Sequence, residues 1–434
     1  RRLIFSPLRS NSSTATTINI IGGTIKNATG TDGGAGIGGG KNSSGATNIE
    51  ITGDALVSAG SSGSAAIGSG ESSTGETTIN IHDTNPEKGV KSAFAYGGAG
   101  IGSGRYAKGK TYVTISNASV STLETPAAST NTSGAGIGTG YGSQSNADIT
   151  ITESTVKAVG GTGAAIGSGS EGDVFSPPTG DPNTFKTIIR ITDSNVTASS
   201  GPSAAIGSGS YSTNATEIHI NGGRIEASNY SGSAIGSGDS AKGKTGIYIT
   251  GSNVTATADI GTGIGSGTSS SGETTIDISG GTVTAMGGGD GYDGSAGIGS
   301  GSHSTGYTHI TLHDGVTVKA TGGGNSSLGG GGGAGIGSGS GDTKNDSKKG
   351  AVTINITDGT IEKAEGKDGG AGIGSGYYGR SSTVNISGNA ELKDVKGGNL
   401  AAGIGSGYDS GKVDVVIDGG TIKATGGDSA AGIG

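Results

Sequence analysis

One short motif, Ala-Gly-Ile-Gly-Ser-Gly or a close variant, recurs thirteen times along the chain and constrains its fold more than any other feature. Successive motif isoleucines are 29 to 40 residues apart, and the spacing never falls below 29. This indicates a structural unit of fixed size that tolerates insertions. A repeat of this length is typical of a solenoid, in which each unit stacks on its neighbours. The copies lie at Ile37, Ile67, Ile101, Ile137, Ile166, Ile206, Ile235, Ile264, Ile298, Ile336, Ile373, Ile404 and Ile433.

Within one repeat, apolar and polar residues alternate as they do in half-buried β-strands. In the shortest unit, residues 217–220 alternate, 221–223 predict a turn, 224–227 alternate again and 234–238 predict a third short strand. Three strands per turn predict an all-β parallel β-helix of about 13 coils, which is about 60 Å long at a coil spacing of about 4.8 Å. Left-handed β-helices and calcium β-rolls use about 18 residues per coil. A unit of 29 residues therefore favours the right-handed form.

The composition fits a long, thin core. The 434 residues include 97 glycines, and only 29% are hydrophobic, which would usually indicate disorder. The apolar residues are strictly periodic, however, so we expect residues 16–434 to form a single continuous β-helix after an N-terminal flank, residues 1–15. The chain lacks an initiator Met and stops inside a repeat, so we interpret it as part of a longer protein.

Charge and cysteine content exclude several classes of function. The net charge of −8 comes without a basic stripe, which argues against nucleic-acid binding. The chain has no cysteine, so it has neither disulfides nor thiolate metal sites. No apolar run approaches eighteen residues, and we therefore predict no membrane span.

The third strand of each repeat is unusual because the residues on both sides of its isoleucine are glycine or alanine. One interpretation is a corner that needs a positive φ or close packing between coils. The other is a bare, flat contact face that a neighbouring molecule covers. The glycines of that candidate contact face are Gly36, Gly38, Gly100, Gly102, Gly136, Gly138, Gly263, Gly265, Gly335, Gly337, Gly372 and Gly374.

The repeats resemble the pectin-lyase-like right-handed β-helices, especially glycine-rich cell-surface proteins built from similar units. Residues 275–285, Thr-Ile-Asp-Ile-Ser-Gly-Gly-Thr-Val-Thr-Ala, carry the resemblance most clearly, and it extends over nearly the whole chain from Thr16. It is specific for architecture and weak for function. The resemblance implies a secreted or cell-surface protein with a structural or adhesive role.

Catalytic and cofactor chemistry find little support. Enzymes on β-helices need clustered acids on one outer face, but the aligned outward residues, such as Lys319, Glu362 and Lys393 of the second strand, form no acid–base constellation. His309 and His313 lie about 13 Å apart along a strand, too far for one metal. Asp290 and Asp293 resemble a calcium-roll motif only once, so an ordinary loop is the simpler interpretation. We predict no catalytic residue, no metal site and no cofactor, and the charged side chains interrupt any ice-binding array.

The chain has more Asn-x-Ser/Thr sequons than chance predicts. Some of them fall in the strand consensus and need no further explanation, but the loop sites do not. A protein in a glycosylating secretory pathway would carry N-glycans at such sites. The candidate sites are Asn11, Asn27, Asn42, Asn117, Asn131, Asn195, Asn214, Asn229, Asn253, Asn325, Asn345, Asn355 and Asn385.

Two functions remain open. In the first, the chain is a non-enzymatic structural element of an extracellular filament, stalk or layer, and self-associates or contacts other surface components. In the second, it is an adhesin or carbohydrate-binding protein that uses loops at the edges of the coils. Loop tyrosines could contact sugars or simply cover a coil edge; they are Tyr96, Tyr106, Tyr141, Tyr211, Tyr377, Tyr378 and Tyr408.

Overall fold

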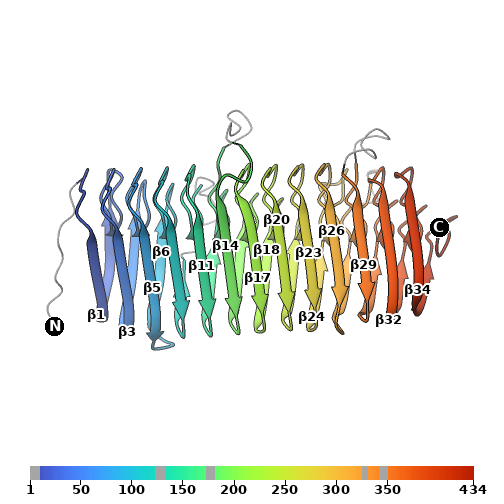
Figure 1. The fold of residues 1–434 in the computed structure, drawn as a ribbon, viewed down its shortest axis with the longest axis horizontal. Helices are drawn as coiled ribbons and strands as arrows, with labels where there is room; N and C mark the ends of the chain where they lie inside the picture. The colour runs from blue at the N-terminus through green and yellow to red at the C-terminus, as the bar shows by residue number, and fades with distance from the viewer. Residues whose placement is uncertain (1–9, 123–132, 173–180, 325–330, 342–349) are drawn as a thin grey trace. The chain divides into compact units, whose positions relative to one another are not determined.

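The computed structural model describes residues 10–122, 133–172, 181–324, 331–341 and 350–434, and it divides into two compact units, residues 1–217 and 218–434. Each unit is a stack of β-coils whose strands lie side by side (Figure 1). In the described part of the chain there is no helix, and hence none that could cross a membrane. These features confirm the predicted all-β parallel β-helix.

In the first unit, every coil contributes a first, a second and a third strand. In β1 (Thr16–Gly30) and β3 (Thr47–Ser61) the first and second strands are continuous. The other first strands are β5 (Thr77–Thr84), β8 (Thr111–Ser116), β11 (Ala147–Thr152) and β14 (Lys186–Thr192), and the second strands are β6 (Gly89–Ala95), β9 (Ser119–Ser121), β12 (Thr155–Val159) and β15 (Asn195–Ser200). The third strands are β2 (Ile37–Gly38), β4 (Ile67–Gly68), β7 (Ile101–Gly102), β10 (Ile137–Gly138), β13 (Ile166–Gly167) and β16 (Ile206–Gly207).

The second unit repeats this order after β17 (Ala215–Asn221), which lies at the boundary. Its first strands are β20 (Thr245–Thr250), β23 (Thr274–Ser279), β26 (Thr308–His313) and β29 (Val352–Thr357), and its second strands are β18 (Arg224–Asn229), β21 (Asn253–Ala258), β24 (Thr282–Met286), β27 (Thr317–Thr321) and β30 (Thr360–Glu365). In β32 (Ser382–Lys396) and β34 (Val413–Thr425) the two are continuous. The third strands are β19 (Ser233–Gly236), β22 (Thr262–Gly265), β25 (Ile298–Gly299), β28 (Ile336–Gly337), β31 (Ile373–Gly374) and β33 (Ile404–Gly405).

Parallel pairing between successive coils places like residues on like residues. Ile149 of β11, for example, pairs with Val113 of β8 and with Ile189 of β14, and all three side chains are fully buried. Because side chains alternate along a strand, the inward aliphatics form continuous columns and the polar residues face outward. Burying each isoleucine stabilises the fold by about 1.5–3 kcal/mol, so these columns form the core.

The third-strand glycines solve a steric problem between coils. Each glycine that follows a motif isoleucine from Gly38 to Gly405 has a φ between +132° and +145°, which is a region that other residues rarely adopt. A Cβ atom on Gly68 would lie 1.7 Å from the carbonyl oxygen of Gly102 in the next coil. Only glycine therefore allows the coils to approach this closely.

This packing corrects the interpretation of the glycines as an open contact face. Among the glycines proposed for that face, Gly100, Gly102, Gly136, Gly138, Gly263, Gly265, Gly335, Gly337, Gly372 and Gly374 are buried within the chain, and Gly36 and Gly38 are half-buried. Their backbone atoms contact neighbouring coils, so no second molecule is needed to cover them. The alternative interpretation, a positive φ and close packing between coils, is the one that the structure supports.

The serine of the motif forms hydrogen bonds between neighbouring coils. The Ser103 hydroxyl accepts the backbone N–H of Gly140 in the next coil at 3.1 Å, and Ser69 does the same for Gly104 at 3.1 Å. Ser338 accepts the N–H of Gly376 at 2.9 Å in the second unit. Buried backbone donors need partners, so the serine column satisfies donors at the corner where the strand ladder ends.

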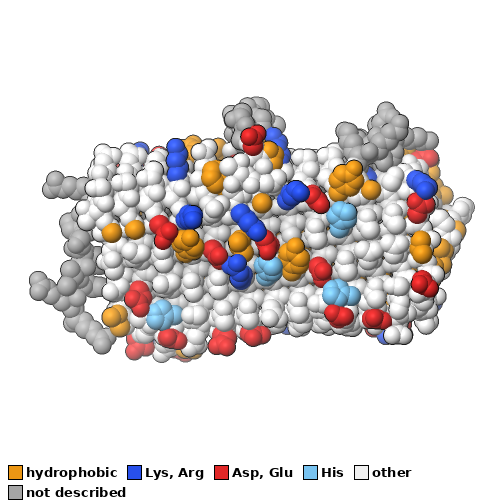
Figure 2. Space-filling model, in the orientation of Figure 1, with side chains coloured by type: hydrophobic (Ala, Val, Ile, Leu, Met, Phe, Trp, Pro, Cys, Tyr) orange, Lys and Arg blue, Asp and Glu red, His pale blue; other side chains and the backbone are white. Residues whose placement is uncertain are grey.

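The outer surface is polar and mixed in charge. Figure 2 shows acidic and basic side chains interspersed on the face that it presents, and the described residues form no basic stripe there. Several of these charges pair between neighbouring coils, for example Arg190 Nη1 with Asp148 Oδ1 at 2.5 Å. Exposed pairs of this kind contribute little to stability, about 0–1 kcal/mol each.

Candidate functional site

The turn after most third strands places one residue in the left-handed conformation, five positions after the isoleucine; Glu171 and Gly341 are the exceptions. Small or polar residues occupy this position in most coils, for example Asn42, Ser72 and Ser269, with φ of 53° to 55°. Tyr106, Tyr211 and Tyr378 occupy it in other coils, with φ of 57°, 58° and 46°. A left-handed conformation costs an ordinary residue roughly 1–2 kcal/mol. Retaining bulky tyrosines in such a position points to a role for their side chains.

The first tyrosine cluster consists of Arg105, Tyr106 and Tyr141, on two successive turns of the first unit. The backbone N–H of Tyr106 donates to the carbonyl of Tyr141 at 2.8 Å, and the two rings meet edge to face with centroids 5.6 Å apart. The Arg105 guanidinium carbon lies 4.6 Å from the Tyr106 ring centre and 5.4 Å from that of Tyr141. Arg105 Nη2 also donates to the Tyr106 hydroxyl at 2.8 Å. The cluster therefore holds a guanidinium on two aromatic rings.

The surroundings of this cluster add a further aromatic pair. Tyr96 and Phe94 meet edge to face at 4.8 Å, and Gly97, which follows Tyr96, accepts the backbone N–H of Tyr141 at 2.8 Å. A Cβ atom on Gly97 would lie 3.2 Å from Cδ of Arg105, so the aliphatic stem of Arg105 passes over this glycine. Two loops, one before and one after the third strand, thus meet at the first tyrosine cluster.

The second tyrosine cluster consists of Tyr377, Tyr378 and Tyr408 in the second unit. The Tyr377 and Tyr408 rings stack with centroids 5.2 Å apart and an interplanar angle of 9°, and Tyr378 lies edge-on to Tyr377 at 4.3 Å. Cβ atoms on Gly331 and Gly369 would lie 2.2 Å and 2.6 Å from Tyr377 ring atoms. Burial, followed by a hydrogen bond with Tyr378, raises the pKa of Tyr377 to about 12.

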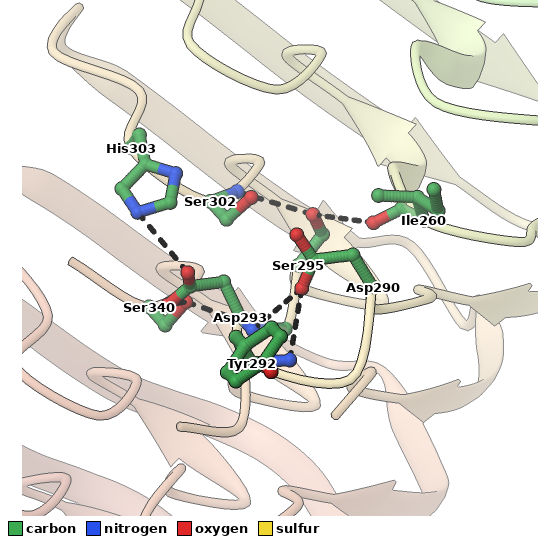
Figure 3. A network of polar contacts seen from close by, with 9 residues as sticks. Ile260, Asp290, Tyr292, Asp293, Ser295, Ser302, His303 and Ser340 are labelled. Carbon is green, nitrogen blue, oxygen red and sulfur yellow. Dashed lines mark hydrogen bonds and ion pairs between the residues drawn. The ribbon is translucent and has the colours of Figure 1, made fainter. Parts of the chain in front are cut away.

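Figure 3 shows a polar network around Asp290 and Asp293. It is linked to the second tyrosine cluster through Gly331, whose backbone N–H donates to the Tyr292 carbonyl and whose Cα lies against the Tyr377 ring. Asp290 Oδ1 accepts the backbone N–H groups of Tyr292 and Asp293, each at 2.9 Å, and Asp293 Oδ1 accepts the Ser340 hydroxyl at 3.1 Å. His303 Nε2 lies 3.4 Å from the other oxygen of Asp293. The carboxylate of Asp293 contacts both the serine and the histidine, whereas an activated nucleophile needs its hydroxyl on the histidine ring. These hydrogen bonds hold the loop that precedes β25 in place.

The described residues also place the histidine and acid candidates. They include no group of three or more His, Asp or Glu that could hold a metal ion. His309 and His313 do not share a partner: His309 faces Glu273 at 3.8 Å, whereas His313 Nε2 lies 2.8 Å from Asp277 and its Nδ1 lies 2.9 Å from Asp314.

His313 forms a cross-coil clip that sequence reasoning missed, and His82 forms an equivalent one in the first unit. His82 Nε2 lies 3.1 Å from Glu50 of the neighbouring coil, and its Nδ1 lies 3.1 Å from Asp83. In both clips the following aspartate has a positive φ, 49° at Asp83 and 52° at Asp314. Hydrogen bonds to these carboxylates raise the pKa of both histidines. The sequence feature that the two clips share is a His-Asp pair at the end of a first strand, and this pair could have predicted them.

Two charged residues, the buried Arg380 and the half-buried Glu171, brace the loops that follow the third strands. The Arg380 side chain is buried, which lowers its pKa to about 10, and Nη1 donates to the carbonyl of Gly306. Burial raises the pKa of Glu171, although its carboxylate accepts hydrogen bonds from Thr213 and Ser212. Neither role could be predicted from the sequence, because some other coils have exposed residues at the same positions, for example Asn42 and Thr74.

The structure divides the candidate glycosylation sites. Asn11, Asn27, Asn42, Asn117, Asn195 and Asn253 are exposed. Asn355 and Asn385 are half-buried, and Asn385 Nδ2 donates to Asn355 Oδ1 at 2.9 Å. Asn214 and Asn229 are buried, 3% and 5% exposed, so a glycan on either would have to displace the residues packed around it. Asn131, Asn325 and Asn345 lie outside the described residues.

Comparison with known proteins agrees with the architecture. Segments 18–41, 149–170, 189–210, 218–239, 276–302, 354–377 and 415–434 match the family model described as a β-helix repeat. Searches of curated proteins and of solved structures found no match. The repeat matches and the parallel strand ladders together show a β-helix built from sequence repeats. The β-helix repeat does not by itself indicate catalysis.

Proposed function

We propose that the chain is a non-catalytic structural β-helix of an extracellular filament, stalk or surface layer. One observation carries the proposal: within each unit, successive coils pair in register, so that isoleucine lies on isoleucine and glycine on glycine. Hydrogen bonds between coils run along the solenoid axis in such an arrangement. Bending a coil stack would strain many of these bonds at once, so it suits a mechanical role.

The surface available for partners differs from the one that the sequence suggested. Since the third-strand glycines pack within the chain, lateral contacts would use the loops and the outer faces of the first and second strands. These faces carry mixed charges and exposed tyrosines, which suits contact with a second copy or with other surface components. The proposal includes the location of the protein, which we expect to be secreted or to lie at the cell surface.

Negative-stain electron microscopy of material from its native source tests the structural role. We expect continuous filaments, a layer, or stalks attached to a surface. Antibodies against the exposed loops, coupled to gold, should label these structures at regular intervals. Dispersed particles that are neither assembled nor attached would overturn the proposal.

A second candidate function, carbohydrate binding by the loops, is favoured by the tyrosines at the strained turn position. Tyr106 and Tyr378 have φ of 57° and 46°, although serine fills the same position in other coils. A glycan array tests this function with the full chain and with Tyr106→Ser, which introduces the residue found at the equivalent Ser72 and Ser269. Loss of signal in the variant would support binding, and an array without signal for either protein would refute it.

A further inference from the structure

We infer that the first tyrosine cluster binds anionic carbohydrate, a sugar ring that bears a carboxylate. The inference rests on the carbohydrate-binding function proposed above, and it adds the place and the charge of the ligand. Arg105 would bind the carboxylate, and Tyr106 and Tyr141 would contact the ring.

Among the residues that the structure describes, no carboxylate pairs with the charge of Arg105. In the same column of loop residues, Glu71 pairs with Lys41 at 3.1 Å. Over the part of the chain that the structure describes, Arg105 forms no ion pair, and its polar contacts are to the two tyrosines. A guanidinium has five N–H donors in a planar fork that matches a carboxylate. One donor is used by the Tyr106 hydroxyl, so others remain for a ligand.

The tyrosines hold this guanidinium in place. Stacking on two rings restricts the Arg105 side chain before a ligand arrives, which reduces the entropy lost on binding. Gly142 makes room for the arrangement, because a Cβ atom there would lie 2.7 Å from Tyr106 ring carbons. The strained backbone of Tyr106, the glycine opposite it and the unpaired guanidinium are separate observations that converge on one place.

The cluster is accessible to a ring-shaped ligand. Tyr106 is 39% exposed, and Tyr96, which precedes the Gly97 under the Arg105 stem, is 46% exposed. An inorganic anion would use only the guanidinium, whereas a sugar acid would use the charge and the aromatic surface together. This combination favours a carboxylated carbohydrate over a free anion.

The second tyrosine cluster provides an internal control. It has three tyrosines, no guanidinium lies over their rings within the described residues, and the carboxylate of Asp409 follows Tyr408 in the chain. An anionic sugar would meet a negative charge there. The same chain thus presents one tyrosine cluster with a cation and one with an anion.

Binding of oligosaccharides to the full chain tests the inference. The probes are a hyaluronan octasaccharide, which carries glucuronate, an uncharged chitin oligosaccharide, and free sulfate as a simple anion. The variants are Arg105→Gln, Tyr106→Ser and Tyr141→Ser, in which serine is the residue of the equivalent turns. Arg190→Gln is the matched control, since Arg190 is paired with Asp148. Circular dichroism and thermal unfolding confirm that each variant is folded.

We expect hyaluronan binding that Arg105→Gln weakens about tenfold or more and that each tyrosine variant weakens several-fold. Arg190→Gln should bind as the parent does. Equal binding of both oligosaccharides would overturn the charge preference and leave carbohydrate binding intact, and no binding of either would overturn both. Competition by sulfate at equal concentration, or hyaluronan binding unaffected by Tyr106→Ser and Tyr141→Ser, would reduce the site to simple charge attraction and refute the inference.

Discussion

The two tyrosine clusters occupy the same kind of turn but differ in what the aromatic rings contact. In the first, Tyr106 and Tyr141 support the Arg105 guanidinium, and Tyr106 remains exposed. In the second, Tyr377 stacks on Tyr408 and packs against Gly331 and Gly369. The first cluster thus presents a charged group, whereas the second mainly covers backbone.

This difference shows how a repeat separates folding from function. The isoleucine, glycine and serine of the motif fix the path of the backbone in every coil, whether the loop then carries Arg-Tyr or Tyr-Tyr. Substitutions in the loop can therefore change surface chemistry without changing the coil. The comparison predicts that motif variants affect both units alike and that loop variants affect one cluster only.

The largest effect should come from the glycines beneath the clusters. Gly138→Ala and Gly374→Ala would place a Cβ atom 1.8 Å and 2.0 Å from a carbonyl oxygen of the next coil, at φ of +138° and +137°. We expect each to lose more than about 3 kcal/mol or to fail to fold. Urea unfolding followed by circular dichroism measures this loss. Gly63→Ala is the control, because its Cβ atom has nothing within 4 Å. Equal midpoints for all three variants would contradict the steric argument.

A smaller effect should distinguish the two clusters. Tyr377→Ala removes a packed, stacked ring, and we expect it to lose about 1–2 kcal/mol. Tyr106→Ser removes the contacts of a partly exposed ring and introduces a residue that other coils have at this turn position, so its change should stay within about 0.5 kcal/mol. Urea midpoints of the two variants test the difference. A Tyr106→Ser loss as large as that of Tyr377→Ala would show that both clusters only cover the backbone.

Alkaline titration adds an independent test of the second cluster. Because the pKa of Tyr377 is about 12 in the folded chain and 10.0 for an ordinary tyrosine, the folded state favours the protonated hydroxyl. The contribution of Tyr377 to stability is therefore fully present below pH 10 and is lost as the pH rises toward 12. Tyrosinate absorbance at 295 nm should show a late-ionising group that Tyr377→Ala removes. A titration curve unchanged apart from amplitude would contradict this assignment.

The sequence predicted the fold because the repeat states the same pattern thirteen times. The spacing of the isoleucines gave the coil, and the alternation at 217–220 and 224–227 gave its strands. It could not decide between the two interpretations of the third-strand glycines, because burial depends on how closely coils approach. Register was also predicted imperfectly: a bulge after Val318 pairs Lys319 with Lys363, where the sequence alignment placed Glu362.

The candidate site was predictable only in part. The positions of Tyr106, Tyr141, Tyr377 and Tyr408 after the motif were visible in the sequence, and their contacts required the structure. Nothing in the sequence indicated that Arg105 would turn toward the tyrosines, because side-chain direction in a loop follows from tertiary contacts.

The smallest expected effect on stability concerns the histidine clips, which have the same contacts in both units. His82 lies between Glu50 and Asp83, and His313 between Asp277 and Asp314, while the paired positions on the neighbouring strands, such as Thr52, Ser116 and Ser279, are uncharged. The pKa of each histidine is raised above 6.5, so the folded state favours the protonated ring. This stabilisation is fully present below pH 6.5 and is lost as the pH rises through the folded pKa. Both side chains are partly exposed, so solvent keeps the effect small.

Urea midpoints between pH 6 and 8.5 should therefore fall slightly for the parent chain, and less for the double variant His82→Gln, His313→Gln. His219→Gln is the control, since His219 stacks on Tyr248 and belongs to neither clip. Histidine NMR titrations should give apparent pKa values above 6.5 for His82 and His313 alike. If the pKa of only one of these histidines is raised, the two clips are not equivalent, and the two units are alike only in their backbone structure.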